Sequence, residues 1–524
     1  MTETDQYYAI TIGPIIETLR LTSSPCGLWA CSYLFSSLSR NICRILYKQT
    51  EIITPYCDEV LLNKKDGIGM FPDRIIFKAN ALSMDEVKKI TEEAVLKSTA
   101  LLFGIYEEPS ETAIKYFNEY FQLHIIKFSP KEWQNVITAS SQALSVVELE
   151  HSFPIMETYN YILDRFELRL DLGEEQRISR NDNIKNSRMV KNINNWQLLE
   201  SSKGTIRDLE SIAAAGFTKD DKARKWMKKH SYYVIVQSDG DNMGKLISDC
   251  TDDKAVNTFS KKCLDYTSVA AGLINGWGGV TIYAGGDDLL FIAPVENNNN
   301  ENILYLLRCI QSEFEKTFGE GSDMPTVSFG VSVCYYKFPL YESFEIAFQM
   351  LRKAKDSRIG KNALALSFQK HSGLSIGILF KEFSKNLCYK NTIKFINKHI
   401  SESAAEDILN SVSFKMALHE ALFVEAIKSH RNNTESSLEY IFKNTFDSDI
   451  HRQTNVSVYL DDIGELLKSS GSQLVLIEKE YDDADEQNEC AVKQDMSDEQ
   501  KLMRAFNGLL RVIKFFSEAG DEEL

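Results

Sequence analysis

The sequence predicts an α+β protein in which two sheet-containing domains are followed by a helical one. Three observations carry this prediction. Apolar strands alternate with amphipathic helices up to residue 368, a Gly-Gly turn with two carboxylates joins two apolar strands at 283–292, and beyond residue 373 apolar positions recur mainly at helical spacing. A chain of 524 residues is long enough for two to four such domains.

The first hundred or so residues predict a small α/β domain. Residues 7–12 (YYAITI) form an apolar strand, and apolar positions at helical spacing follow over 28–45. A second strand is expected at 74–79 and a helix at 84–102, with Ser83 as its N-cap. We find no acid at a strand end that would give this domain a metal site of its own.

The region between the two sheet-containing domains is less regular. Residues 110–147 are expected to be mostly helical, and residues 177–195, rich in Asn, Arg, Lys and Ser, to form a long loop. That loop is interpreted as solvated, with RNA contact as the alternative. The basic run at 222–230 (KARKWMKKH) is interpreted as a solvated helix face, with contact to a phosphate backbone as the alternative.

The second sheet-containing domain has the element order β-α-α-β-β-α-β-α-β. This is the order of a ferredoxin-like palm with additions, an architecture shared by polymerase palms and nucleotide cyclases. Its strands are expected at 232–238, 280–283, 289–293, 326–335 and 363–368, and its helices near Met243 and at 261–275, 301–318 and 344–355.

These patterns divide the chain into four parts. Residues 1–110 are predicted to be an α/β domain, which the resemblance to a known family implies to be palm-like and non-catalytic, and residues 111–228 a helical or linker region. Residues 229–372 are predicted to be the catalytic palm. Residues 373–524 are predicted to be a helical domain with an acidic loop at 478–490.

Composition restricts the classes of protein that fit. The net charge of −16 argues against a protein that coats nucleic acid through bulk electrostatics, but it leaves a local basic groove possible. The ten cysteines are scattered without any C-x-x-C pair, so we expect reduced thiols and no tightly bound zinc. No apolar run has the length of a membrane span, and we expect a cytoplasmic protein without membrane contact.

Three carboxylates form the candidate catalytic site: Asp239, Asp287 and Asp288. The Gly285-Gly286 turn places two of them at the tip of a buried hairpin, and the turn alone is equally consistent with an ordinary Asp-capped hairpin. The strand that ends at Asp239 is expected beside this hairpin. Clustered buried carboxylates repel one another unless a cation neutralises them, and three of them match a two-metal phosphoryl-transfer site that holds Mg²⁺ or Mn²⁺.

Glycines and lysines around these acids suit a triphosphate. Gly240 lets the backbone approach the metal, and Gly244 at a helix start offers free N–H groups to phosphate. Lys245 is within reach of the same phosphates. Lys355 and Lys361 frame a turn after the last helix, from which Lys355 could neutralise the γ-phosphate, although a solvated helix lysine is the alternative.

Two sets of motifs carry a resemblance to known families. Residues 328–331 (SFGV) and the segment 347–362, taken with DGD and GGDD, resemble the nucleotidyl cyclase (GGDEF-type) palm. A closer resemblance is to the large subunit of type III CRISPR effector complexes, in its III-B (Cmr-type) form. The segments that carry it are 12–14 (IGP), 28–34 (LWACSYL), 239–246 (DGDNMGKL), 285–288 (GGDD), 336–340 (YKFPL) and 370–373 (KHSG).

This resemblance implies a function. In such complexes, binding of target RNA by a guide CRISPR RNA switches on synthesis of an adenylate second messenger, cyclic oligoadenylate, from ATP for antiviral defence. The partners implied are other Cmr-type subunits, the guide RNA and the target RNA. Some relatives instead join AMP to S-adenosylmethionine, and an inactive scaffold subunit or a stand-alone diguanylate cyclase are further alternatives.

The sequence departs from many members of that family in two ways. None of its eight His residues precedes an Asp, so we expect the form that lacks an HD domain and has no DNA nuclease activity. The zinc ribbon common between the palms is also missing, because no C-x-x-C pair exists.

The resemblance also assigns roles to residues. It implies that Asp239, Gly240 and Asp287 are metal ligands, and that Asp288 holds metal or orients the attacking 3′-hydroxyl. The residues implied to contact nucleotide are Asp241, Met243, Gly244, Lys245, Gly285, Gly286, Ser328, Lys355 and Lys361.

Overall fold

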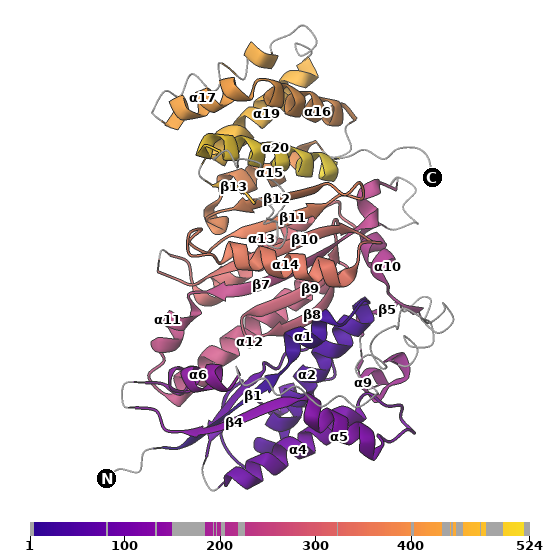
Figure 1. Cartoon of the computed structure of the whole chain (residues 1–524), viewed down its shortest axis with the longest axis vertical. Coiled ribbons are helices and arrows are strands. Elements are labelled where there is room, and N and C mark those ends of the chain that lie inside the picture. Colours follow the sequence, from indigo (N-terminus) through magenta and orange to yellow (C-terminus); the bar gives the residue numbers. More distant parts are fainter. Residues whose placement is uncertain are drawn as a thin grey trace, which may run out of the picture.

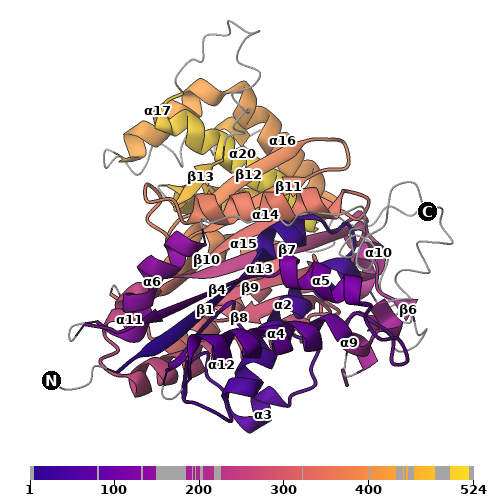
Figure 2. The ribbon, with the colours of Figure 1, turned by 60° about the horizontal axis from the view of Figure 1, so that its bottom comes forward.

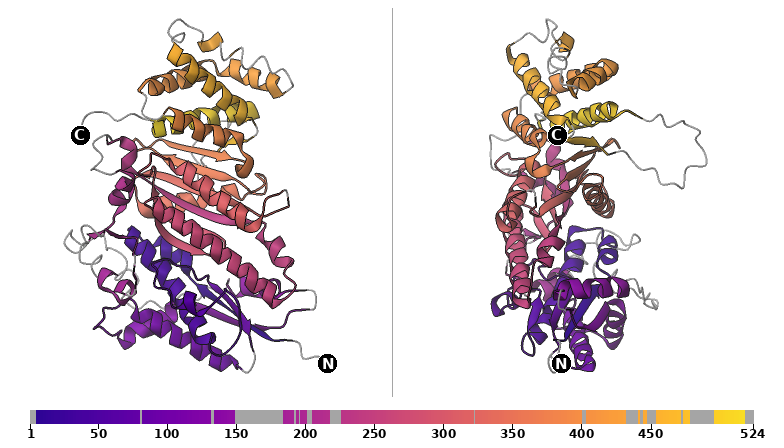
Figure 3. Two further views of the ribbon diagram at one scale, coloured as in Figure 1. Left: turned by 180° about the vertical axis from the view of Figure 1, so that it is seen from behind. Right: turned by 90° about the vertical axis from the view of Figure 1, so that its left-hand side faces the viewer.

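The computed structural model describes most of the chain between residues 5 and 517. The first sheet-containing domain lies at one end of the molecule, the second in the middle and a group of helices at the other end (Figures 1 and 3). None of the described helices is long and apolar enough to cross a membrane. The segments not described are 80–81, 132–133, 149–183, 192, 195, 201–204, 218–225, 322, 400–402, 432–440, 442–443, 447–453, 472 and 478–495.

The first sheet has four antiparallel strands in the order β2-β3-β1-β4. Its central strand β1 pairs with β3 on one side and with β4 on the other, over seven residues in the second case. The expected strands at 7–12 and 74–79 are thus confirmed. The bounds are β1 Tyr7–Gly13, β2 Ile52–Thr54, β3 Arg74–Lys78 and β4 Gln122–Phe128.

Strand β4 corrects the prediction that residues 110–147 are mostly helical. The segment QLHIIKF is only seven residues long and carries two adjacent isoleucines, and its pairing with β1 decides its conformation. The helices before and after it do form, and the capping box at Ser83 is present. They are α1 Ile15–Arg20, α2 Pro25–Leu46, α3 Glu59–Leu62, α4 Met84–Ala100, α5 Glu111–Tyr120 and α6 Val136–Val147.

The second sheet has seven strands in the order β13-β12-β11-β10-β7-β9-β8. The first four strands of this sheet in chain order are β7, β8, β9 and β10, and they lie side by side as β10-β7-β9-β8. The first sheet, read in the direction β4-β1-β3-β2, has the same arrangement. The chain therefore contains two ferredoxin-like palms, as predicted. The bounds are β7 Tyr232–Asp241, β8 Val280–Gly285, β9 Asp288–Pro294, β10 Thr326–Tyr335, β11 Leu364–Gln369, β12 Ser375–Phe380 and β13 Leu474–Leu476.

Helices cover both faces of the second sheet. One face packs on α12 and α13, through alternate strand residues such as Val234 and Phe291. The other face packs on α14, which lies against β10 at Gly330: a Cβ there would collide with the backbone of Leu351 and Ala347. The bounds are α11 Met243–Ser248, α12 Asp253–Gly276, α13 Ile303–Phe318 and α14 Leu340–Ala354.

The two palms are joined along the edge strand β8. The backbone N–H of Ala284 donates to the carbonyl of Gly69 in the first palm at 2.9 Å, and the Ser32 hydroxyl of α2 donates to the carbonyl of Ile282 at 2.9 Å. Side chains of α2 and of β8 also belong to one hydrophobic core. Figure 2 shows α2 and the first sheet against β8 and β9. The edge of the second sheet is thus covered by the first palm.

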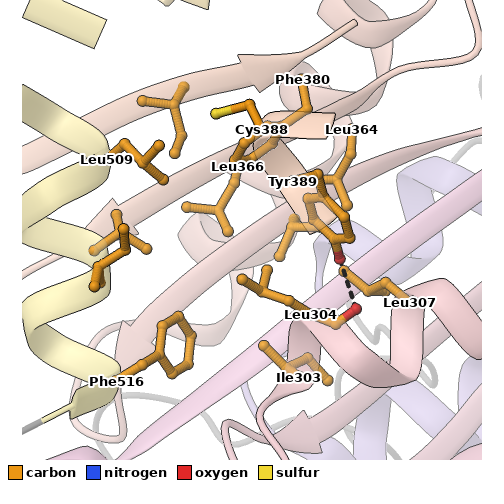
Figure 4. Close-up of a cluster of buried hydrophobic side chains, with 14 of the residues drawn as sticks. Ile303, Leu304, Leu307, Leu364, Leu366, Phe380, Cys388, Tyr389, Leu509 and Phe516 are labelled. Atoms are coloured by element: carbon orange, nitrogen blue, oxygen red, sulfur yellow. Dashed lines mark hydrogen bonds between the residues drawn. The ribbon is translucent and has the colours of Figure 1, made fainter. Parts of the chain in front are cut away.

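The C-terminal part is mostly helical, as expected, but it also extends the second sheet through β12 and β13. Its helices share the core of the second palm, where the Tyr389 hydroxyl donates to the Leu304 carbonyl at 2.6 Å (Figure 4). The predicted acidic loop 478–490 lies outside the described residues. The helices are α15 Leu387–Lys398, α16 Ser403–Leu418, α17 Glu420–Arg431, α19 Thr454–Ser470 and α20 Asp498–Ser517.

The connection between the palms contains short elements. Of the predicted loop 177–195, residues 177–183 lie outside the described chain, and α9 lies within the remainder. The fourfold division of the chain stays a prediction, although β4, β12 and β13 place sheet residues beyond its proposed boundaries. The short elements are α9 Arg188–Lys191, β5 Leu199–Glu200, β6 Thr205–Ile206, α10 Leu209–Ala213, η1 Ala214–Gly216, η2 Lys228–Ser231 and η3 Phe383–Lys385.

The described end of the basic run 222–230 differs from the solvated helix face that the sequence suggested, and residues 222–225 lie outside the described chain. Lys229 and His230 are both buried, and the Lys229 ammonium lies 2.5 Å from Glu296 and donates to the carbonyl of Phe516 in α20 at 3.0 Å. Burial alone would raise the pKa of Glu296, but His230, whose Nε2 atom lies 3.5 Å from the carboxylate, and the charge of Lys229 outweigh it and lower that pKa. This ion pair ties β7 and the segment after β9 to the C-terminal helix.

We expect Lys229→Met to destabilise the chain by about 3–5 kcal/mol, because the Glu296 carboxylate would remain buried without its cation. Urea unfolding followed by tryptophan fluorescence measures the loss. Lys228→Met removes the same charge from the exposed neighbouring position and should change stability by less than about 0.5 kcal/mol. Equal unfolding midpoints for the two variants would contradict this account.

Candidate active site

Asp239 lies near the end of the central strand β7. Strand β10 flanks it on one side, where it faces Ser328, and β9 flanks β7 on the other side, in a register that pairs Ser238 with Leu289. The next step of that register brings Asp239 opposite Asp288, the first residue of β9. Asp239, the first acid after the apolar residues of β7, therefore lies beside the start of β9.

Asp287 and Asp288 are held by the β8–β9 hairpin. Gly285 pairs with Asp288, so Gly286 and Asp287 form a two-residue turn, and Gly286 has a φ of +65°. This left-handed conformation suits glycine and explains its place in the motif. Asp287 lies against Gly240 of β7, where an added Cβ would come within 2.5 Å of the Asp287 Oδ2 atom. The structure thus brings Asp239, Asp287 and Asp288 together.

The three carboxylates repel one another. Loss of hydration and then the charge of Asp239 raise the pKa of Asp287 to about 6. Desolvation by surrounding protein, followed by the charges of Asp287 and Asp239, raises the pKa of Asp288 well above its usual range, although the residue is exposed by surface area. These shifts are what a concentration of negative charge with too little positive charge beside it produces.

Lys355 supplies the nearest positive charge. It directly follows α14, and its ammonium forms an ion pair with Asp239, lies 3.7 Å from Asp241 and donates to the carbonyl of Gly240 at 2.9 Å. Its side chain is 23% exposed. The interpretation of Lys355 as a solvated helix residue is therefore wrong, and its place beside a triphosphate stays a prediction.

Asp241 belongs to a buried polar network. Its carboxylate accepts hydrogen bonds from Ser328 at 2.7 Å, from Thr326 at 3.0 Å and from the backbone N–H of Asn362 at 2.9 Å. Burial raises its pKa, and these hydrogen bonds and the charge of Lys355 counter that rise. Asp241 and Ser328 are fully buried, and their assignment to nucleotide binding stays a prediction. In this structure they fix the turn at 361–362.

The other predicted nucleotide contacts differ in accessibility. The Met243 side chain is buried in the core and touches Gly240, which leaves only its backbone for a ligand. Lys245 is 59% exposed and lies 3.7 Å from Asp323. The Lys361 ammonium donates to Asn242 at 3.3 Å. The space beside Gly244 is open, as it is at Gly286, whereas a Cβ on Gly285 would meet the Tyr283 ring.

The first palm contributes an acid that sequence reasoning missed. Asp73 immediately precedes β3. Burial and then the charge of Asp73 raise the pKa of Tyr283, and Asp73 adds to the larger effects of burial, Asp287 and Asp239 on the pKa of Asp288. Its backbone carbonyl accepts from the N–H of Ile12 at 3.0 Å, which fixes its position at the palm boundary. In the sequence, Asp73 is only an acid next to the start of a strand. Its position near Asp288 becomes apparent once the two palms are placed side by side.

The side chains at this site have the chemistry of metal ligands. Among the described residues, no three His, Cys, Asp or Glu side chains are arranged to hold one metal ion, and Lys355 partly neutralises the cluster. The donor chemistry nevertheless fits Mg²⁺ or Mn²⁺, because carboxylate oxygens are the ligands these ions prefer. The glycine at position 240 also keeps clear the space that a side chain would fill.

Fold and site together define a class: proteins with two ferredoxin-like palms, of which the second has a nucleotidyl cyclase-like fold and carries acids at its central strand and hairpin. Residues 232–365 match the family described as Cas10/Cmr2, second palm domain. The CRISPR system Cmr subunit Cmr2 of Pyrococcus furiosus is 31% identical over 169 residues, which cover 27% of this chain and 19% of that protein.

A solved structure extends the likeness to the whole fold. The apo state of a type III-B Cmr-beta complex contains a chain that superposes with a TM-score of 0.51 at 12% identity, over 98% of this chain and 82% of that one. Residues 232–365 thus resemble the second palm of Cas10/Cmr2 proteins, and the chain shares its fold with a chain of a type III-B complex. The sequence match to the curated relative spans about a fifth of that relative's length.

We expect Gly240→Ala to destabilise the chain by about 1–3 kcal/mol, because the new methyl group would overlap Asp287 and the Met243 side chain, 2.8 Å away. Gly244→Ala is the matched control: nothing lies within 4 Å of its added Cβ, and alanine favours the helix α11. Thermal unfolding of both variants checks this. Equal stability of the Gly240→Ala and Gly244→Ala proteins would contradict this prediction, because the hairpin would then move aside without a loss of stability.

Proposed function

We propose that this chain is the nucleotidyltransferase subunit of a type III effector complex, and that target RNA activates it to make cyclic oligoadenylate from ATP. The observation that carries the proposal is the meeting of Asp239, Asp287 and Asp288 at one end of β7 and β9, in a palm that matches the Cas10/Cmr2 family. The reaction would join the 3′-hydroxyl of one nucleotide to the α-phosphate of the next, with pyrophosphate leaving.

Asp239, Asp287 and Asp288 would hold Mg²⁺ or Mn²⁺. When bound, the ions would neutralise charge on the triphosphate and on the attacking oxygen. The protein's own contribution is positional. Gly240 leaves room for the Asp287 carboxylate, and the two-residue turn aims both hairpin acids at the end of β7. Lys355 supplies a fixed positive charge at the same place, which suits attraction of a phosphate.

Other components of the complex belong to the same proposal. The curated relative is described as a Cmr subunit, and the superposed structure is a type III-B complex. We therefore propose other Cmr-type subunits, a guide CRISPR RNA and a target RNA as partners. An inactive scaffold in such a complex would need neither the hairpin acids nor ATP.

We expect Asp287→Asn with Asp288→Asn to lower ATP consumption at least about 100-fold, since both hairpin carboxylates are lost while their shape is kept. The assay uses the full chain assembled with its complex, target RNA and Mg²⁺, and follows pyrophosphate release. Glu92→Gln with Glu93→Gln removes the same charge from the exposed face of α4 and should leave the rate unchanged. Undiminished turnover in the hairpin variant would favour the scaffold.

Mass spectrometry of the products tests which molecule accepts the AMP group from ATP. With ATP alone and with added S-adenosylmethionine, we expect rings built from AMP units in both reactions, because the proposed acceptor is a second ATP-derived hydroxyl. An adduct of AMP with S-adenosylmethionine that replaces the rings would change the product assigned here and leave the nucleotidyltransferase assignment intact.

A further inference from the structure

A cavity of about 380 Å³ lies in the first palm, away from the carboxylates. The second half of α2, the residues after α3 and the end of α4 line it, and Met189 of α9 closes one side. Four of the lining residues are cationic, and none of the described lining residues is Asp or Glu. The cations are Arg40, Arg44, Lys64 and Lys65.

The two arginines of this basic cavity are held at fixed positions. Arg40 donates to the carbonyl of Lys64 at 3.0 Å and to the Tyr33 hydroxyl at 3.3 Å, and it lies over the Tyr33 ring. Arg44, one turn further along α2, donates to the carbonyl of Leu62. Backbone and phenol oxygens thus orient both guanidinium groups, and neither guanidinium forms an ion pair with a carboxylate of the described residues.

One buried donor at the basic cavity is unpaired. Among the described residues, the Arg40 Nε atom is buried and has no hydrogen-bond partner. Burial and, second to it, the nearby charge of Arg40 lower the pKa of Arg44. Of the four cations, Lys64 has a carboxylate partner, Asp66 at 2.6 Å.

We infer that the basic cavity binds a compact polyphosphate anion, carried by a nucleotide or present as free inorganic polyphosphate. Arginine forks match phosphate oxygens in geometry, and a buried unpaired N–H gains most from an acceptor. The volume lies within the range of small-molecule sites. The cavity is built from α2, α3, α4 and α9, whereas the carboxylates lie on β7 and β9, so this site is separate from the proposed catalytic one.

Calorimetric titration of the full chain with sodium tripolyphosphate, and separately with ATP, tests the inference. EDTA is present throughout, so that binding at the carboxylates through divalent ions is suppressed. We expect saturable binding that Arg40→Gln with Arg44→Gln weakens about tenfold or more, and that Lys65→Gln weakens about threefold. Tighter binding of ATP than of tripolyphosphate would identify a nucleotide, and equal binding would identify the polyphosphate alone.

Lys88→Gln with Lys89→Gln is the matched control, because it removes two charges from the exposed side of α4 and should leave binding unchanged. Lys65→Gln keeps the inference testable if the arginine variant fails to fold, since none of the described hydrogen bonds or ion pairs uses its side chain. Absence of saturable binding to either probe, or equal affinity in wild type, Lys65→Gln and any folded arginine variant, would overturn the inference.

Discussion

Asp239, Asp287 and Asp288 repel one another, and the fold of the second palm must hold them close together against this repulsion. The register of β7 and β9 forces the first and third of these acids beside each other, and the hairpin turn adds the second. Such an arrangement persists only where the surrounding fold determines the backbone on every side. Here β10 and β8 flank the paired strands β7 and β9, and helices cover both faces of the sheet.

The positive charge that Lys355 brings to this cluster depends on a packing feature some distance along the sheet. Because position 330 is glycine, the backbone of α14 approaches β10 more closely than a side chain would permit. The helix therefore ends where Lys355 reaches Asp239 and the carbonyl of Gly240. At the opposite end of β7, the Lys229–Glu296 pair fixes the strand to α20. Both ends of the central strand are thus held by lysines.

Much of the fold and the central part of the site could be predicted from the sequence, because both follow from local patterns. The strand at 232–238 is apolar throughout, and the Gly-Gly turn requires a left-handed residue at Gly286. Strand β4, the buried Lys229 and the acid Asp73 were missed for a common reason. The conformation or environment of each depends on a partner more than sixty residues away in the sequence, such as β1 or Glu296. A local sequence pattern does not identify that partner.

The backbone around the hairpin leaves little freedom for the carboxylates to separate. On one side β9 is paired with β7, and on the other β8 is bonded through Ala284 to Gly69 of the first palm. Separation of Asp239 from the hairpin acids would break strand pairing or the boundary between the palms. Lys355, by contrast, is a partly exposed side chain at a helix end, so its removal from Asp239 needs only rotamer changes. Loss of Lys355 from Asp239 would therefore cost less than separation of the carboxylates, which the paired strands hold in place.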